Sequence, residues 1–220
     1  MKFLLTSNGI SNVSIEKALF ELLGRPLNET KVAFIPTAAN YFSEDKSWLV
    51  EDMNYFREKN FPFIDIVDLA ALQKDQWLPR LEAVDLICVG GGSEQYLAQV
   101  MQTSGCAAEL PRLLGRRVYM GISAGGMYIS QFLEREALNI VYPEETFEGE
   151  LFPSLGLVDC HVLPHLNSSF FSRMREEVIR STAGKNLEYP LYALDDNSAL
   201  KVVDGQIEVV TEGEFLKIEK

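Results

Sequence analysis

The sequence contains few of the residues that build metal centres, disulfide frameworks or nucleic-acid surfaces. Its 220 residues include three cysteines and two histidines. Cys88, Cys106 and Cys160 form no CxxC pair and no framework spacing, which argues against a zinc site or a disulfide scaffold. We therefore expect no metal, and the simplest setting for three free thiols is the reducing cytoplasm.

Positive charge and long apolar runs are also scarce. There are 20 basic against 32 acidic residues, a net charge of −12, and no lysine- or arginine-rich cluster. Nucleic acid is thus not an expected partner, because its binding depends on neutralising phosphates. No apolar stretch approaches the roughly 20 residues that cross a bilayer, and the opening "MKFLLTSNG" lacks the features of a signal peptide. We expect a cytoplasmic protein without a membrane partner, either a monomer or a homodimer.

Short apolar runs alternate with segments of helical periodicity over the first 133 residues. The runs are continuously apolar, which is typical of strands buried on both faces of a parallel sheet. We therefore predict an α/β fold with a mostly parallel central sheet, in one domain spanning residues 1–220. The predicted strands are 2–7, 31–38, 63–69, 85–92 and 118–123, and the predicted helices are 14–24, 48–60, 77–83, 93–104 and 124–133.

The last third has a different pattern, with strands predominating. The Asp-Gly pair within "VVDGQIEVV" predicts a hairpin turn. The predicted strands here are 159–165, 189–194, 198–205 and 206–213, with one helix at 171–184.

Two glycine-rich turns follow predicted strands, "GGG" at 90–92 and "GISAGG" at 121–126. Ligands of open parallel sheets bind beyond the carboxyl ends of the strands, so the two turns would face one crevice if their strands are neighbours. GxSxG between a strand and a helix favours a nucleophilic serine, Ser123, with the amide of Ala124 aimed at an oxyanion. A tight turn with an N-cap serine and an anion-binding turn are the alternatives.

A serine nucleophile needs a base, and the chain offers only His161 and His165. His165 lies where a predicted strand ends, so it is the candidate base, whereas His161 within the strand is interpreted as a packed or surface residue. Asp195 and Asp196, in "LDDNSAL", are candidates to orient the histidine. The chain order Ser, His, Asp differs from the Ser, Asp, His order of α/β-hydrolases, which argues against an ordinary lipase or esterase.

The segments "VGGGSEQYL", "GISAGG", "LGLVDCHVLPHLN" and "LDDNSAL" together resemble the S51 serine peptidases, among them aspartyl dipeptidase (peptidase E) and cyanophycinase. The resemblance covers nearly the whole chain. It implies a three-layer α/β sandwich related to the class I glutamine amidotransferases and a serine-type exopeptidase acting on short peptides without a cofactor. Hydrolysis of another acyl or isopeptide substrate, and a small-molecule-binding homologue without turnover, remain alternatives.

The resemblance also implies roles for particular residues. Ser123 falls on the family nucleophile, His165 on its histidine, and Asp196 on its acid, which is a glutamate in the dipeptidase. Asp195 and Glu136 remain alternatives for that acid.

Oxyanion and substrate contacts are implied at Gly91, Gly92 and Ala124. A preference for N-terminal aspartate would need a cation, for which Arg173 or Arg175 is available. The sequence departs from the dipeptidase at Ser93-Glu94 and in the glycine-free segment 166–175, both of which are expected to line the substrate pocket.

Overall fold

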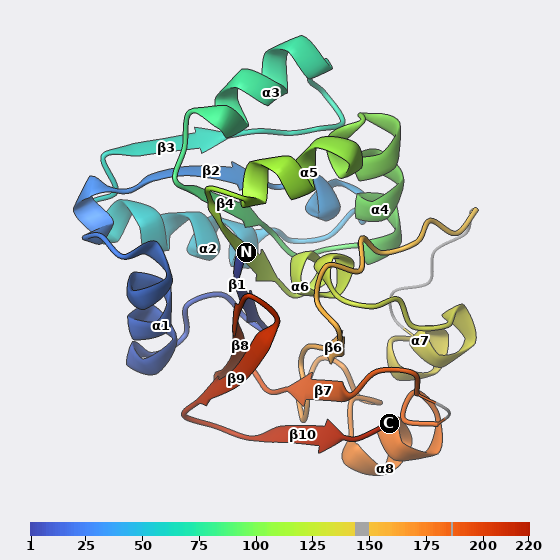
Figure 1. Cartoon of the computed structure of the whole chain (residues 1–220). Coiled ribbons are helices and arrows are strands. Elements are labelled where there is room, and N and C mark those ends of the chain that lie inside the picture. Colours follow the sequence, from blue (N-terminus) through green and yellow to red (C-terminus); the bar gives the residue numbers. More distant parts are fainter. Residues whose placement is uncertain (144–149, 186) are drawn as a thin grey trace.

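A seven-stranded sheet forms the centre of the molecule in the computed structural model, which describes residues 1–143, 150–185 and 187–220 (Figure 1). The strand order is β3-β2-β4-β5-β1-β8-β9. The first five strands in this order are parallel, and β8 and β9 continue the sheet as an antiparallel hairpin. The bounds are β1 Lys2–Thr6, β2 Lys31–Ile35, β3 Phe63–Ile66, β4 Leu86–Val89, β5 Val118–Ile122, β8 Ser198–Val203 and β9 Gln206–Thr211.

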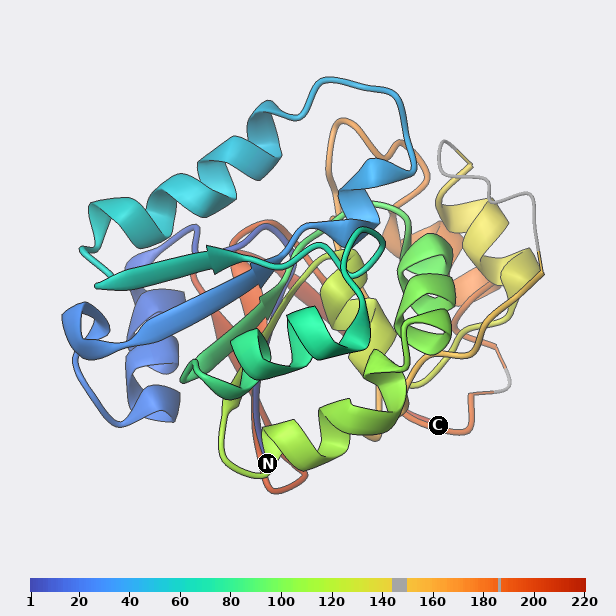
Figure 2. The ribbon, with the colours of Figure 1, turned by 90° about the horizontal axis from the view of Figure 1, so that it is seen from above.

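Helices cover both faces of this sheet, giving three layers (Figure 2). Because side chains alternate along a strand, Leu4 packs with α1 and α2 in one core cluster, while Phe3 and Leu5 pack with α3 to α6 in another. Continuous apolar strands are therefore required, as the sequence pattern predicts. The helices are α1 Val13–Leu23, α2 Ser47–Glu58, α3 Lys74–Glu82, α4 Glu94–Thr103, α5 Cys106–Leu114 and α6 Ala124–Ile129.

A second, three-stranded sheet lies beside the main sheet, in the order β10-β7-β6 (Figure 1). Strands β6 (His161–Leu163) and β7 (Leu191–Leu194) are parallel, and β10 (Phe215–Ile218) pairs antiparallel with β7. Helices α7 (Arg135–Val141) and α8 (Glu176–Ser181) contribute to the apolar cluster around this sheet.

Several features differ from the sequence-based prediction. The strand β10 and the helices α5 and α7 have no predicted counterparts, and the helix predicted at 171–184 shortens to α8. Residues 171–175 instead form turns, because Phe171 and Met174 are buried and the Arg175 guanidinium binds the carbonyls of Phe171, Met174 and Ser168. Tertiary contacts thus override the helical periodicity of this segment.

Helix α6 also ends earlier than predicted, at Ile129 rather than 133. Ser130 is extended, and the Gln131 amide donates to the Cys160 carbonyl, 2.8 Å away. In the described ranges, no helix has the length and apolar character needed to cross a membrane.

Candidate active site

Ser123 occupies a sharp turn between β5 and α6. Its backbone angles, φ 48° and ψ −111°, are uncommon for a residue with a side chain. The Ser123 amide donates to the Thr6 carbonyl at 2.9 Å, and the Ser123 carbonyl accepts from the amides of Gly126 and Met127. The GxSxG segment therefore forms the strand–turn–helix that the motif predicts.

The two outer glycines of the motif allow this turn to pack against the sheet. A Cβ atom on Gly121 would lie 2.6 Å from the Gly125 carbonyl, and one on Gly125 would lie 2.2 Å from the Val89 carbonyl oxygen. Both distances are far below van der Waals contact, so any larger residue would push α6 away from β4 and β5.

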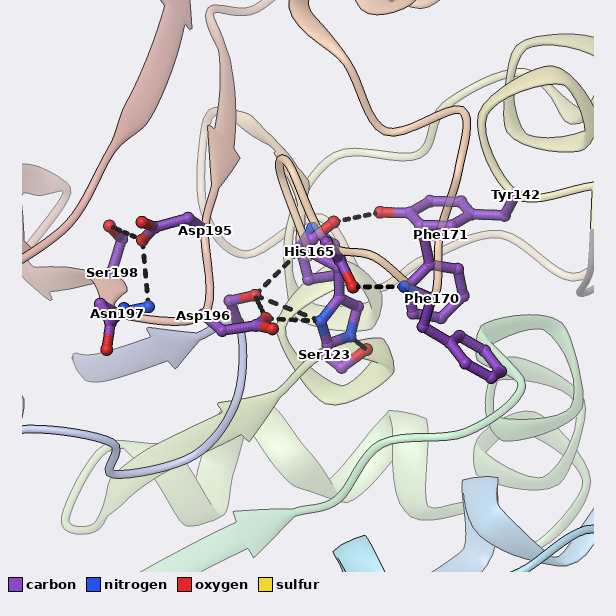
Figure 3. Close-up of polar contacts among 12 residues, drawn as sticks. Ser123, Tyr142, His165, Phe170, Phe171, Asp195, Asp196, Asn197 and Ser198 are labelled. Carbon is purple, nitrogen blue, oxygen red and sulfur yellow. Dashed lines mark hydrogen bonds and ion pairs between the residues drawn. The ribbon is translucent and has the colours of Figure 1, made fainter.

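The His165 ring lies between Ser123 and Asp196 (Figure 3). Its Nε2 is 3.0 Å from Ser123 Oγ, and its Nδ1 is 2.7 Å from Asp196 Oδ1. An ionised carboxylate can only accept, so the Nδ1 proton points to Asp196 and Nε2 is left to accept from the serine hydroxyl. This is the arrangement that general-base activation of a serine requires.

The histidine and the acid reach the serine from the smaller sheet. His165 lies two residues beyond β6 and Asp196 two residues beyond β7. Because β6 and β7 are parallel neighbours, their carboxyl ends lie at one edge of the small sheet. Ser123 follows β5 in the main sheet, so the three side chains meet where the two sheets adjoin.

Ser7, just after β1, joins the three residues, although the sequence analysis did not identify it. Its hydroxyl donates to Asp196 Oδ1 at 2.9 Å and accepts the His165 backbone N–H at 2.8 Å. Strand β1 is the neighbour of β5, so its carboxyl end lies beside Ser123. That adjacency is the signal that could have identified Ser7, but only once the strand order is known.

These contacts keep Asp196 ionised. Burial would raise the pKa of this carboxyl, but the hydrogen bond and charge of His165 and the hydrogen bond from Ser7 outweigh burial and hold the pKa below its usual value of 3.8. The carboxylate therefore carries its charge at neutral pH, where it can stabilise a protonated imidazole.

The neighbouring acid, Asp195, has a structural role. Its Oδ1 accepts from the Asn197 amide at 3.0 Å and the Ser198 hydroxyl at 2.6 Å (Figure 3). Its Oδ2 accepts from the Glu214 amide at 2.6 Å. These bonds close the turn between β7 and β8 and tie it to the segment before β10. Of the two adjacent acids, Asp196 is the one that contacts His165.

Aromatic side chains fix the plane of the His165 ring. The Phe171 ring stacks on it with centroids 4.8 Å apart and an interplanar angle of 22°. Tyr142 contacts the Phe171 ring edge-on at 5.4 Å and donates its hydroxyl proton to the Pro164 carbonyl at 2.8 Å (Figure 3). The turns of 171–175 thus support the histidine instead of extending α8.

A cavity of about 450 Å³ opens beside Ser123. The predicted contact residues Gly91 and Gly92 line it, and a Cβ on Gly91 would lie 3.4 Å from the Ser123 Cβ. Among the hydrogen bonds of the described residues, none uses the amide of Gly91 or Ala124. Gly91 lines the cavity, whereas Ala124 is buried directly after Ser123 and is not among the lining residues. The cavity is lined by Ser7, Asn8, Glu44, Asp45, Trp48, Asp52, Gly91, Gly92, Ile122, Ser123, His165, Ser168, Phe170, Phe171 and Asp196.

Several residues singled out from the sequence lie away from this cavity. Glu136 and Arg173 are exposed and do not line it. Ser93 caps α4 by accepting from the Tyr96 amide, and Glu94 is buried beside it. Ser93 and Glu94 do not line the cavity beside Ser123 and instead line a separate one with Met127 and Leu138, whereas Ser168, Phe170 and Phe171 of segment 166–175 line the cavity beside Ser123.

The chain is similar to known peptidases in sequence and in fold. The model of peptidase family S51 matches residues 3–210. An uncharacterized peptidase of Listeria monocytogenes is 27% identical over 180 residues, covering 79% of this chain and 83% of that protein. An uncharacterized peptidase of Listeria innocua is 26% identical over 196 residues, covering 86% and 88%.

Solved structures share the architecture. The crystal structure of a proposed peptidase E protein from Listeria monocytogenes superposes with a TM-score of 0.79 at 20% identity, covering 96% of this chain and 98% of that one. A peptidase from an acI-B1 Actinobacterium gives 0.70 at 18% identity, covering 99% and 90%. The fold is the three-layer α/β sandwich of the class I glutamine amidotransferase-like type, as predicted.

Proposed function

This chain belongs to peptidase family S51, a family of serine peptidases, and we propose that it is an exopeptidase that cleaves short peptides through Ser123, His165 and Asp196. One observation carries the proposal. The Ser123 hydroxyl, the His165 imidazole and the Asp196 carboxylate form a continuous hydrogen-bonded chain beside a cavity of about 450 Å³. The two hydrogen bonds of this chain are 3.0 Å and 2.7 Å long.

In the first half of the reaction, His165 Nε2 takes the hydroxyl proton as Ser123 Oγ attacks the carbonyl carbon of the substrate. The Asp196 carboxylate stabilises the imidazolium that forms. The resulting oxyanion accepts from the amides of Ala124 and Gly91, a contribution of roughly 3 kcal/mol for each donor. Proton transfer from His165 to the nitrogen then releases the amine and leaves an acyl-enzyme.

In the second half, water replaces the amine. His165 Nε2 removes a proton from water as its oxygen attacks the acyl carbon, and the same pair of amides stabilises the second oxyanion. Return of the proton to Ser123 Oγ breaks the acyl bond and restores the starting state. Ser7 positions the imidazole and the carboxylate, because its hydroxyl binds both the His165 backbone amide and Asp196 Oδ1.

The size of the cavity favours short substrates. About 450 Å³ is typical of small-molecule sites and suits a di- or tripeptide better than an extended polypeptide. Phe170, which is 66% exposed, stands at the rim and offers an apolar surface to a substrate side chain.

A preference for N-terminal aspartate is not part of the proposal. The residue suggested to bind that side chain, Arg173, is exposed and outside the cavity lining, and the Arg175 guanidinium is engaged by three carbonyls. The charged residues that line the cavity are acidic, and their charge disfavours binding of the carboxylate side chain of a substrate aspartate there.

The proposal is tested by active-site labelling combined with a peptide library. A fluorophosphonate probe should modify Ser123, and the wild type should release free amino acids from unblocked di- and tripeptides while Ser123→Ala does neither. Hydrolysis of esters or isopeptides without hydrolysis of peptides would favour another acyl substrate. Absence of labelling in the folded wild type would favour a binding protein without turnover.

A further inference from the structure

Negative charge dominates the cavity beside Ser123. Four acids line it, and the described lining residues include no lysine or arginine. Two of the acids already have partners: Asp196 binds His165 at 2.7 Å, and Glu44 lies 3.4 Å from the Lys46 ammonium. Asp45 is exposed to solvent. This leaves Asp52 as the half-buried carboxylate in the cavity that needs a counter-charge.

Asp52 lies on α2 and faces the turn that follows β1. Its Oδ1 would be 2.7 Å from a Cβ on Gly9, so the carboxylate is pressed against this turn, which also carries Ser7. In the described part of the chain, Asp52 has neither a hydrogen bond nor an ion pair. Burial, with a smaller effect from the charge of Glu51, raises its pKa to about 7. A positive charge in the cavity would lower the pKa of Asp52 and offset the free-energy cost of burying its carboxylate.

Trp48 completes a place for such a charge. It lies one helical turn before Asp52 and lines the same cavity. Its ring edge would be 3.6 Å from a Cβ on Gly91, so the indole reaches the glycine turn beside the nucleophile. Indole faces attract ammonium and guanidinium groups, and a carboxylate nearby strengthens the attraction.

We propose that Asp52 and Trp48 bind a cationic group of the substrate, so that the enzyme selects peptides carrying a positive charge next to the bond that Ser123 attacks. This inference rests on the proposed peptidase function and specifies its substrate class. The cation is either the α-ammonium of the substrate or the side chain of a lysine or arginine residue.

The surroundings of Asp52 provide room for either source. A second cavity of about 210 Å³ shares Asn8, Trp48, Asp52 and Ile122 with the first, so space continues past the carboxylate. An organic cation suits the site better than a metal ion, because no group of three His, Cys, Asp or Glu side chains among the described residues is placed to hold a metal.

The test uses three amino-acid amides with the same unbranched backbone frame: norleucine amide, Nα-acetyl-lysine amide and Nα-acetyl-norleucine amide. The first carries only an α-ammonium, the second only a side-chain ammonium, and the third no charge. Calorimetric binding to Ser123→Ala requires no turnover. We expect one of the charged compounds to bind about tenfold or more tightly than the neutral one, as a charge-assisted contact predicts. The charged compound that binds more tightly than the neutral one identifies whether the cation is the α-ammonium or the side chain.

Asp52→Asn in the same background should bring the affinities of the charged and neutral compounds to within about twofold of each other. The matched control is Glu58→Gln, an exposed acid on the same helix, which should keep the difference. Equal binding of all three compounds by the Ser123→Ala protein, or an Asp52→Asn protein that still discriminates, would overturn the proposal.

Turnover separates this proposal from the peptidase function itself. With the 4-nitroanilides of the same three acyl groups, the wild-type enzyme should show a higher kcat/KM for the favoured charged compound than for the neutral one. Asp52→Asn should bring the two kcat/KM values to within about twofold of each other, whereas Glu58→Gln should keep the difference. If no peptide or anilide is cleaved and Ser123 is not labelled, the peptidase function fails, whereas the binding experiment still decides whether Asp52 selects cations.

Discussion

His165 Nε2 lies 3.0 Å from Ser123 Oγ, although 42 positions separate the two residues and they follow strands of different sheets. The distance is that of a hydrogen bond, so proton transfer needs no rearrangement of the backbone.

The unusual backbone of Ser123 predicts that glycine is more stable than alanine at this position, although both substitutions abolish activity. Ser123→Ala and Ser123→Gly should both reduce kcat/KM by a factor on the order of 10⁴ or more, because both remove the proposed nucleophile. Glycine tolerates φ 48°, so Ser123→Gly should be more stable than Ser123→Ala by about 1 kcal/mol. Urea unfolding of the two variants measures the difference. A more stable alanine variant would show that the turn is not strained.

The two adjacent acids should respond oppositely to substitution. Asp196→Asn should reduce kcat by about 10³ to 10⁴, because an amide cannot hold His165 in the required tautomer, with little loss of stability. Asp195→Asn should instead lower the unfolding free energy by about 1–3 kcal/mol, because it weakens three hydrogen bonds, while the folded fraction keeps its kcat.

Glu136→Gln is the control for this pair, since Glu136 is exposed on α7 and should affect neither quantity. Steady-state kinetics and denaturant unfolding on the four proteins suffice. If Glu136→Gln loses most of its kcat while Asp196→Asn stays active, Glu136 and not Asp196 is the acid of the proposed triad.

Ser7→Ala tests a residue that holds two members of the proposed triad, His165 and Asp196, in place. Loss of its bonds to Asp196 and to the His165 amide should reduce kcat about tenfold and leave KM nearly unchanged. Ser181→Ala, an exposed serine at the end of α8, is the matched control. An effect of Ser7→Ala on KM alone would show that Ser7 contacts the substrate instead.

The buried Glu94 should make the protein less stable as pH rises. Burial outweighs the hydrogen bonds from Ser154 and Gln95 and raises the Glu94 pKa from 4.5 to about 7. The folded state therefore holds this proton more tightly than the unfolded state does. Its contribution is present below pH 4.5 and is lost as pH rises to about 7, an effect on the order of 3 kcal/mol at most.

Unfolding free energies at pH 5 and pH 8 measure this effect. The decline between the two values should be smaller in Glu94→Gln than in the wild type. Part of the decline should persist, because the pKa of Asp52 is raised over the same range. Asp196 does not contribute in this window, since its lowered pKa places its titration below pH 4. An unchanged decline in Glu94→Gln would contradict the prediction.

The sequence by itself determined the layered α/β architecture and the strand–turn–helix that carries Ser123, the proposed nucleophile. Both depend on local information: continuous apolar runs require strands covered on both faces, and GxSxG between a strand and a helix produces a turn that only glycine permits at Gly121 and Gly125. His165 could be chosen because histidine is scarce and because this one follows a strand. The assignment of the chain to one domain stays a prediction.

Tertiary structure alone decided which side chains meet. Asp195 and Asp196 are chemically identical neighbours, and the turn between β7 and β8 determines which of them faces His165. Ser7 and Asp52 gave no signal, because their roles arise from the adjacency of β1 to β5 and from the packing of α2 against the turn after β1. Such adjacencies depend on strand order and on packing between distant segments, which local propensity and periodicity do not encode.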